Sequence, residues 1–108
     1  ESRAEVLYES YAKHIRIEAR VMLQMVGKDY IPGVIRFLNR LDSSQPVQEK
    51  LADKVTSLLE RLECLRGELE RQTAAAEALP EAKSVAEAFR QRVVPVMEQL
   101  PIFGTLNL

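Results

Sequence analysis

The sequence has little of the chemistry on which most enzymes and metal proteins depend. Its 108 residues include one cysteine, Cys64, one histidine, His14, and no tryptophan. A single thiol excludes an intramolecular disulfide and a cysteine-based zinc site, and it fits a reducing cytoplasm. A single histidine excludes zinc motifs that need two, and the glycine-rich loops that bind phosphate groups are also missing. We therefore expect no catalytic, cofactor-binding or metal-binding residue in this chain.

Long hydrophobic runs and an excess of one charge are absent as well. No apolar run approaches the ~18 residues of a membrane-spanning helix. The 15 basic and 16 acidic residues are interspersed and give a net charge of −1. Balanced charge argues against a nucleic-acid partner and against a membrane surface. The charged first ten residues lack an initiator methionine and resemble no targeting peptide, so we expect a cytoplasmic fragment of a longer chain.

The sequence does contain strong helical periodicity, beginning with the segment from about Arg3 to Val26. One face of this segment is apolar and the opposite face is charged, which is typical of a helix packed on a core. The apolar face comprises Leu7, Tyr8, Tyr11, Ile15, Ala19, Val21, Met22, Met25 and Val26. Gly27 weakens the pattern, and Pro32 lacks an N–H and disfavours helical geometry at Ile31. We predict a kink or short break between Gly27 and Pro32, followed by a second helical segment.

A longer helix is predicted from about Pro46 to Leu79, with Ser43 or Ser44 as its N-cap. Its leucines and one valine recur at alternating intervals of four and three, the spacing of a heptad seam. The seam consists of Leu51, Val55, Leu58, Leu62, Leu65 and Leu69. We expect Leu58 and Leu62 to be buried on it.

The last helix is predicted over residues 81–100, with a kink near Gln91 caused by Pro95. The apolar residues 101–108, PIFGTLNL, follow without helical periodicity. The fold class is therefore all-α. We expect an elongated antiparallel bundle of three to four helices over residues 1–100, its first helix kinked at Gly27–Pro32. The tail at 101–108 would fold over the bundle end or pack on a second copy, and a homodimer is favoured.

A few residues of the first helix could carry more than packing. Glu18 falls within the apolar face, so it requires a partner, either His14 one turn earlier or a base from another helix such as Arg90 or Arg92. Met22 fits a core position better than a soft-metal site. Tyr11 is expected to pack with its hydroxyl at the bundle edge.

The run from Tyr11 to Val21, YAKHIRIEARV, resembles a helix near the C-terminus of type III glutamine synthetases. Ile31-Pro32-Gly33-Val34 and Val94-Pro95-Val96-Met97 are similar to later stretches of that region, with a variable helix between them. The resemblance implies a glutamate–ammonia ligase that uses ATP and a divalent metal in a homo-oligomer. Its ligands would lie in an upstream catalytic domain, so none is carried over here. Tyr11, Lys13, Glu18 and Pro32 match only as parts of a helical element, and PIFGTLNL departs from the family's charged final helix.

Two functions remain open. The first is a non-catalytic C-terminal helical domain that serves packing or oligomer assembly, with the upstream catalytic domain of the same polypeptide as its partner. The second is a stand-alone helical protein-interaction module, whose heptad seam binds a partner helix or itself. Tyr11, His14, Glu18, Met22, Pro32, Leu58, Leu62 and Pro95 are the structural or interface candidates under either interpretation.

Overall fold

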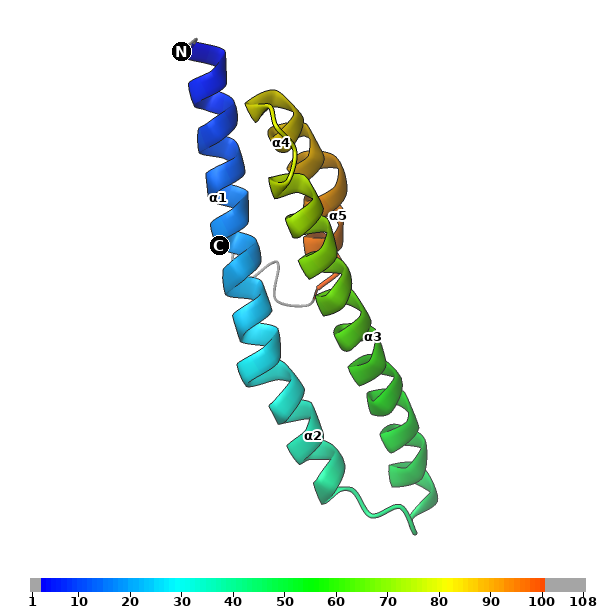
Figure 1. Cartoon of the computed structure of the whole chain (residues 1–108). Helices are drawn as coiled ribbons and strands as arrows, with labels where there is room; N and C mark the ends of the chain where they lie inside the picture. Colours follow the sequence, from blue (N-terminus) through cyan, green and yellow to red (C-terminus); the bar gives the residue numbers. More distant parts are fainter. Residues whose placement is uncertain (1–2, 101–108) are drawn as a thin grey trace.

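The computed structural model describes residues 3–100, which form three antiparallel helical rods (Figure 1). The first rod is α1 (Arg3–Met25), a π-helical turn η1 (Val26–Tyr30) and α2 (Ile31–Arg40). The second is α3 (Pro46–Glu77), and the third is α4 (Ala82–Ala88), a π turn η2 (Phe89–Val93) and α5 (Val94–Glu98). The molecule measures 64 × 24 × 17 Å. The all-α, elongated fold with a distorted first helix is confirmed.

The third rod is shorter than the other two and covers only one end of the molecule. α4 packs against α1, while η2 and α5 pack against α3. α2 packs against α3 at the opposite end, where Figure 1 shows these two helices alone. The third rod ends beside Arg61, whose Nη2 donates to Oε1 of Gln99 at 3.2 Å. The bundle therefore has a three-helix end and a two-helix end.

The core lies mainly in the three-helix end. The largest side chains that are fully buried come from all three rods: Phe89, Met22, Leu62, Leu69, Met97, Val26 and Val93. No polar or charged residue among residues 3–100 is buried, so the core is held by apolar packing. Met22 and Leu62 occupy the core positions that the sequence predicts.

Both π turns lie immediately before a proline that sits in the first turn of the next helix. In η1 the N–H of Ile31 donates to the carbonyl of Val26, and in η2 the N–H of Val94 donates to that of Phe89. Pro32 and Pro95 lack the N–H that an α-helix would use, and their rings would clash with the preceding turn. A wider turn accommodates each proline without ending the rod. The distortions expected at Gly27–Pro32 and near Gln91 are thus π turns and not breaks.

Two predictions about α3 are wrong. Leu58 is 47% exposed, because the third rod ends at the level of Arg61, whereas the neighbouring Leu59 packs against the core. The N-cap is Gln45 and not Ser43 or Ser44, and no side chain caps the helix. The expectations about the tail fall on residues 101–108, which lie outside the described residues.

Asp42 organises the loop before α3 in place of a serine cap. Its Oδ1 accepts hydrogen bonds from the backbone N–H and the hydroxyl of Ser44, at 3.0 and 2.7 Å. Its own N–H donates to Oε1 of Gln48 at 2.6 Å. The Ser44 hydroxyl, followed by the Ser44 N–H, lowers the pKa of the Asp42 carboxyl. Ser44 thus serves as a donor to the loop, where the sequence pattern suggested an acceptor for the helix.

Candidate interaction surfaces

The first candidate feature is the pair formed by His14 and Glu18 on α1. Nε2 of His14 lies 2.9 Å from Oε1 of Glu18, which confirms one of the two partners expected for this carboxylate. The His14 side chain is 70% exposed and that of Glu18 is 22% exposed, so Glu18 is less deeply buried than its place in the sequence pattern predicts. A pair this open to water stabilises the helix only weakly. Its position matters more, since it lies beside an exposed apolar stripe.

This α1 stripe consists of Leu7, Ile17 and Val21, all exposed. Leu7, His14 and Val21 are seven residues apart and Ile17 lies between the last two, so all four share one side of the helix. The core side of α1 is formed by Ala12, Ile15, Ala19 and Met22. By helical spacing the two stripes lie on nearly opposite sides of α1, so the prediction that Leu7 and Val21 belong to the packed face is wrong. An apolar stripe of this length, facing away from the core, is typical of a surface that packs on another protein part.

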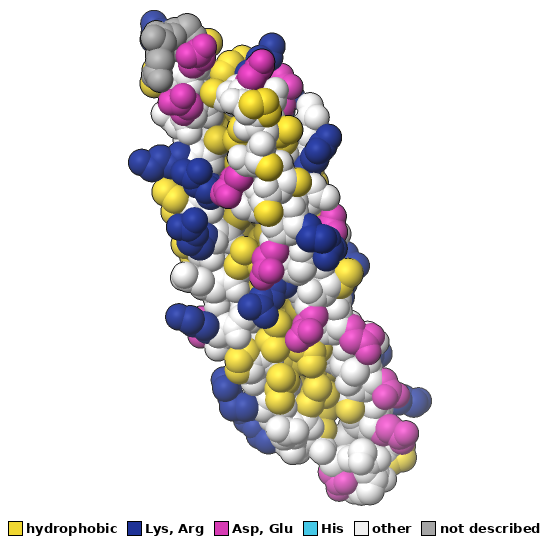
Figure 2. All heavy atoms as spheres, in the orientation of Figure 1, with side chains coloured by type: hydrophobic (Ala, Val, Ile, Leu, Met, Phe, Trp, Pro, Cys, Tyr) yellow, Lys and Arg dark blue, Asp and Glu magenta, His cyan; other side chains and the backbone are white. Residues whose placement is uncertain are grey.

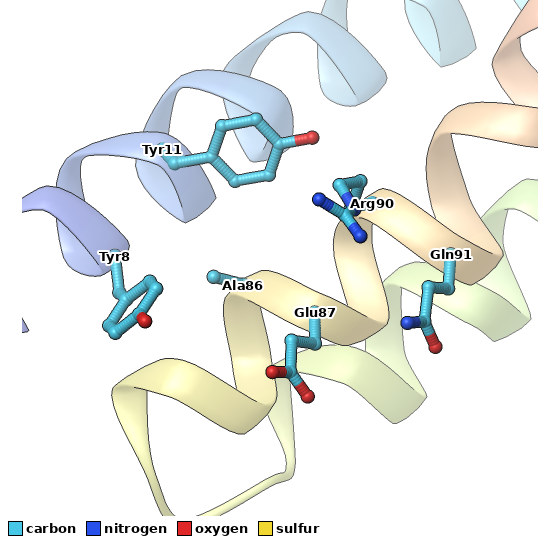
Figure 3. A pocket seen from close by; sticks show the side chains of 6 residues that line it. All are labelled: Tyr8, Tyr11, Ala86, Glu87, Arg90 and Gln91. Atoms are coloured by element: carbon cyan, nitrogen blue, oxygen red, sulfur yellow. The ribbon is translucent and has the colours of Figure 1, made fainter.

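The second candidate is a cavity of about 390 Å³ between α1 and the third rod. Tyr8 and Tyr11 line it from α1, and Glu87, Arg90 and Gln91 line it from the other side, with Ala86 at its base (Figure 3). Figure 3 shows the hydroxyl of Tyr11 directed toward the side of Arg90. Glu87, Arg90 and Gln91 are exposed, so the polar groups form a rim and do not converge on one point. The arrangement gives the tyrosine rings an edge position and lacks the convergent polar groups of a small-molecule site.

The third candidate is a groove at the two-helix end, between α2 and α3. Its volume is about 440 Å³, and its lining is almost wholly apolar: Tyr30, Gly33, Val34, Phe37, Val55 and Leu58, with Asp29 as the one charged residue. Phe37 is 41% exposed, and Leu51 and Val47 extend the exposed apolar row along α3. The two-helix end therefore exposes the apolar surface that a third helix would cover.

Two other kinds of site, a metal centre and a membrane span, are absent from residues 3–100. Among residues 3–100, no three His, Cys, Asp or Glu side chains gather where they could hold a metal ion. No helix in that range is long and apolar enough to cross a membrane. Cys64 is exposed on α3.

The residues chosen from the sequence are not brought together into one site. Pro32 lies in the first turn of α2 and Pro95 in the first turn of α5, and each follows a π turn. Leu58 lines the groove, whereas Leu62 is in the core. The helical pattern predicts Phe37 on the buried side of the second segment, and its 41% exposure shows that this prediction is wrong. The relative lengths of the predicted helices could have indicated this exposure, because the first two rods carry apolar residues beyond the end of the shorter third rod.

One comparison with known proteins gives a match. Residues 1–50 match the family model of the glutamine synthetase C-terminal domain. No curated protein and no solved structure matches the chain. The matched residues include the α1 stripe, the His14–Glu18 pair, η1 and the whole of α2.

Proposed function

We propose that this chain is the non-catalytic helical part of a type III glutamine synthetase C-terminal domain, and that it serves packing or oligomer assembly. The observation that carries the proposal is the match of residues 1–50 to the glutamine synthetase C-terminal domain. The resemblance at Ile31–Val34 and Val94–Met97 supports the type III assignment and extends beyond the matched residues. Under this proposal the enzyme is a cytoplasmic, homo-oligomeric ligase that joins ammonia to glutamate.

The α1 stripe is the surface that we assign to this role. Leu7, Ile17 and Val21 are exposed, apolar and within the matched residues. They lie away from the chain's own core, so they are free to pack on an upstream catalytic domain of the same polypeptide. Burial of apolar surface of this kind drives association.

ATP and a divalent metal, which the resemblance implies for the whole enzyme, do not fit the residues described here. No cluster of His, Cys, Asp or Glu in residues 3–100 could hold a metal ion. The cavity beside Tyr8 and Tyr11 offers one cation, Arg90, with Glu87 on the same rim, which is unsuited to a triphosphate. We therefore assign both groups to the catalytic domain and derive no step through them.

A stand-alone helical interaction module is the second candidate, and one observation favours it. Leu51 and Leu58, two members of the exposed apolar row on α3, lie outside the residues that match the family model. Such a module would use that row without any catalytic partner.

The size and activity of the native polypeptide separate these two functions. An antibody raised against the 108-residue chain would be used to isolate the native protein, with pre-immune serum as the control. We expect a polypeptide far larger than the 12.3 kDa of this chain, with glutamine-forming activity in the precipitate. A polypeptide of only this size, without activity, would exclude the proposal and leave the interaction module.

A further inference from the structure

The groove at the two-helix end continues the path of the third rod. Arg61 contacts Gln99 just beyond the end of α5, and Leu58 lies one turn before Arg61 on the same side of α3. Leu51 and Val47 continue that side toward the start of α3, and all three apolar residues are exposed. At 1.5 Å per residue, the uncovered row from Val47 to Leu58 is about 17 Å long, which corresponds to about three turns of a packed helix.

The rim of this groove carries positive charge. On α3, Lys50, Lys54 and Arg61 are four and seven residues apart, so they follow the same side as Leu58. The acidic residues of the same stretch, Glu49, Asp53, Glu60 and Glu63, follow a different side by their own spacing. Figure 2 shows Asp and Glu side chains gathered along the α3 edge of the face in view.

The α2 side of the rim is also basic. The guanidinium of Arg36 lies over Gly33, 3.8 Å from where a β-carbon would stand, and Gly33 lines the groove. Arg40 follows Arg36 by four residues and Phe37 by three, so it extends the same edge. Among the described residues, none of Arg36, Arg40, Lys50 and Lys54 is in an ion pair. Asp29 is the only carboxylate in the lining.

We propose that the groove binds one amphipathic helix of about three turns, whose apolar stripe is flanked by Asp and Glu. The apolar lining would accept the stripe, and the unpaired cations on both rims would select the acidic flanks. A second copy of this chain is a poor occupant of this face, because a two-fold axis through the groove would bring the same basic rims against each other. The inference rests on the surface of this chain alone and does not require the proposed enzyme.

A pair of synthetic helices tests the charge selection. The first is a hydrocarbon-stapled peptide of three turns with leucines at helical spacing and glutamates on both flanks. The second is the same peptide with lysines in place of the glutamates, and stapling keeps both helical when free. Fluorescence anisotropy on the full 108-residue chain should show the glutamate peptide binding at least about tenfold more tightly, the sum of several exposed ion pairs. Equal binding of both peptides, or binding of neither, would overturn the proposal.

Variants then locate the binding. Leu58→Ser should abolish binding of the glutamate peptide, and Lys54→Glu should reduce the preference between the two peptides. Glu60→Lys on the other side of α3 and Leu79→Ser, just beyond the far end of α3, are matched controls that should leave binding unchanged. Circular dichroism melts would show that each variant is folded. Equal loss in the controls and in Leu58→Ser would mean that binding is non-specific and would overturn the proposal.

The same samples also test two other possible occupants of the groove. If residues 101–108 filled the groove, truncation after Leu100 would be needed before the peptide could bind. If a second copy filled it, sedimentation would show a dimer that Leu58→Ser converts to a monomer. Either result would overturn the assignment of the groove to an acidic helix. Binding by the intact, monomeric chain supports it.

Discussion

The guanidinium of Arg66 on α3 lies directly against Gly27 in the π turn of the first rod. A β-carbon at position 27 would stand 3.1 Å from Nη2 and 3.2 Å from Cζ of Arg66. Nε of Arg66 is 3.7 Å from Oε1 of Glu70, one turn along α3. This contact joins the distorted part of the first rod to the middle of the second. Close packing explains why position 27 is a glycine, because its backbone is not in the left-handed region that would itself favour glycine.

Gly27→Ala should therefore gain less stability than the same change at Gly67. Both glycines are in helical backbone, where alanine is favoured by ~0.5–1 kcal/mol. At Gly67 the nearest atom is Nη1 of Arg71 at 3.4 Å, an ordinary contact, so nearly the full gain is expected. At Gly27 the Arg66 guanidinium must shift, which offsets part of the gain. Urea unfolding of both variants measures this, and a larger gain at Gly27 would mean that Arg66 does not pack there.

Leu62→Ala should destabilise the bundle by ~2–5 kcal/mol, as for other buried leucines. Leu62 is 2% exposed and lies in the three-helix end. Leu58→Ala, one turn earlier on the same helix, should cost less than ~1 kcal/mol because half of that side chain is already in water. The two variants are matched in residue type and helix, and urea melts compare them. Similar losses would show that Leu58 is covered in solution.

Glu18→Ala should cost ~0.5 kcal/mol more than Glu9→Ala, which is typical of a helix pair open to water. Glu18 is paired with His14 and is partly buried, whereas Glu9 is exposed on the same helix. Thermal unfolding of the two variants provides the comparison. Equal stability would assign no energetic role to the His14–Glu18 pair.

The loop at Asp42 should weaken in acid. Hydrogen bonds from Ser44 lower the pKa of Asp42 from its ordinary 3.8, so the folded state binds a proton less readily than the unfolded state. Its contribution is present above that value and is lost as the pH falls through the lower, folded-state pKa. Asp42→Ala should therefore be less stable than the parent at neutral pH and equally stable in strong acid. Melting curves across the acid range test this, with Ser44→Ala as a variant expected to show a smaller difference.

The sequence was sufficient for the helices, because apolar residues recur with helical spacing over long segments and prolines mark the distortions. It placed the start of α3 at about Pro46, where the structure has it. It could not distinguish a π turn from a break at Pro32, because either one accommodates a proline that has no N–H to donate. The difference depends on whether packing on each side, at Val26 and Ile31, keeps the rod continuous.

The error at Leu58 has a different origin. A heptad seam indicates that one side of a helix is apolar, but it does not predict how far the neighbouring helix extends along that side. The third rod ends beside Arg61, so the part of the seam before that point is left open. The groove could not be predicted for the same reason, since it requires the relative lengths of three rods and the basic residues on two of them.

The proposal that this chain has no nucleotide site of its own is tested most directly by calorimetric titration with Mg-ATP. The 108-residue chain carries no phosphate-binding loop, and its described residues hold no carboxylate cluster for a metal. We predict only the heat of dilution up to millimolar nucleotide. A saturable site with micromolar affinity would contradict the account.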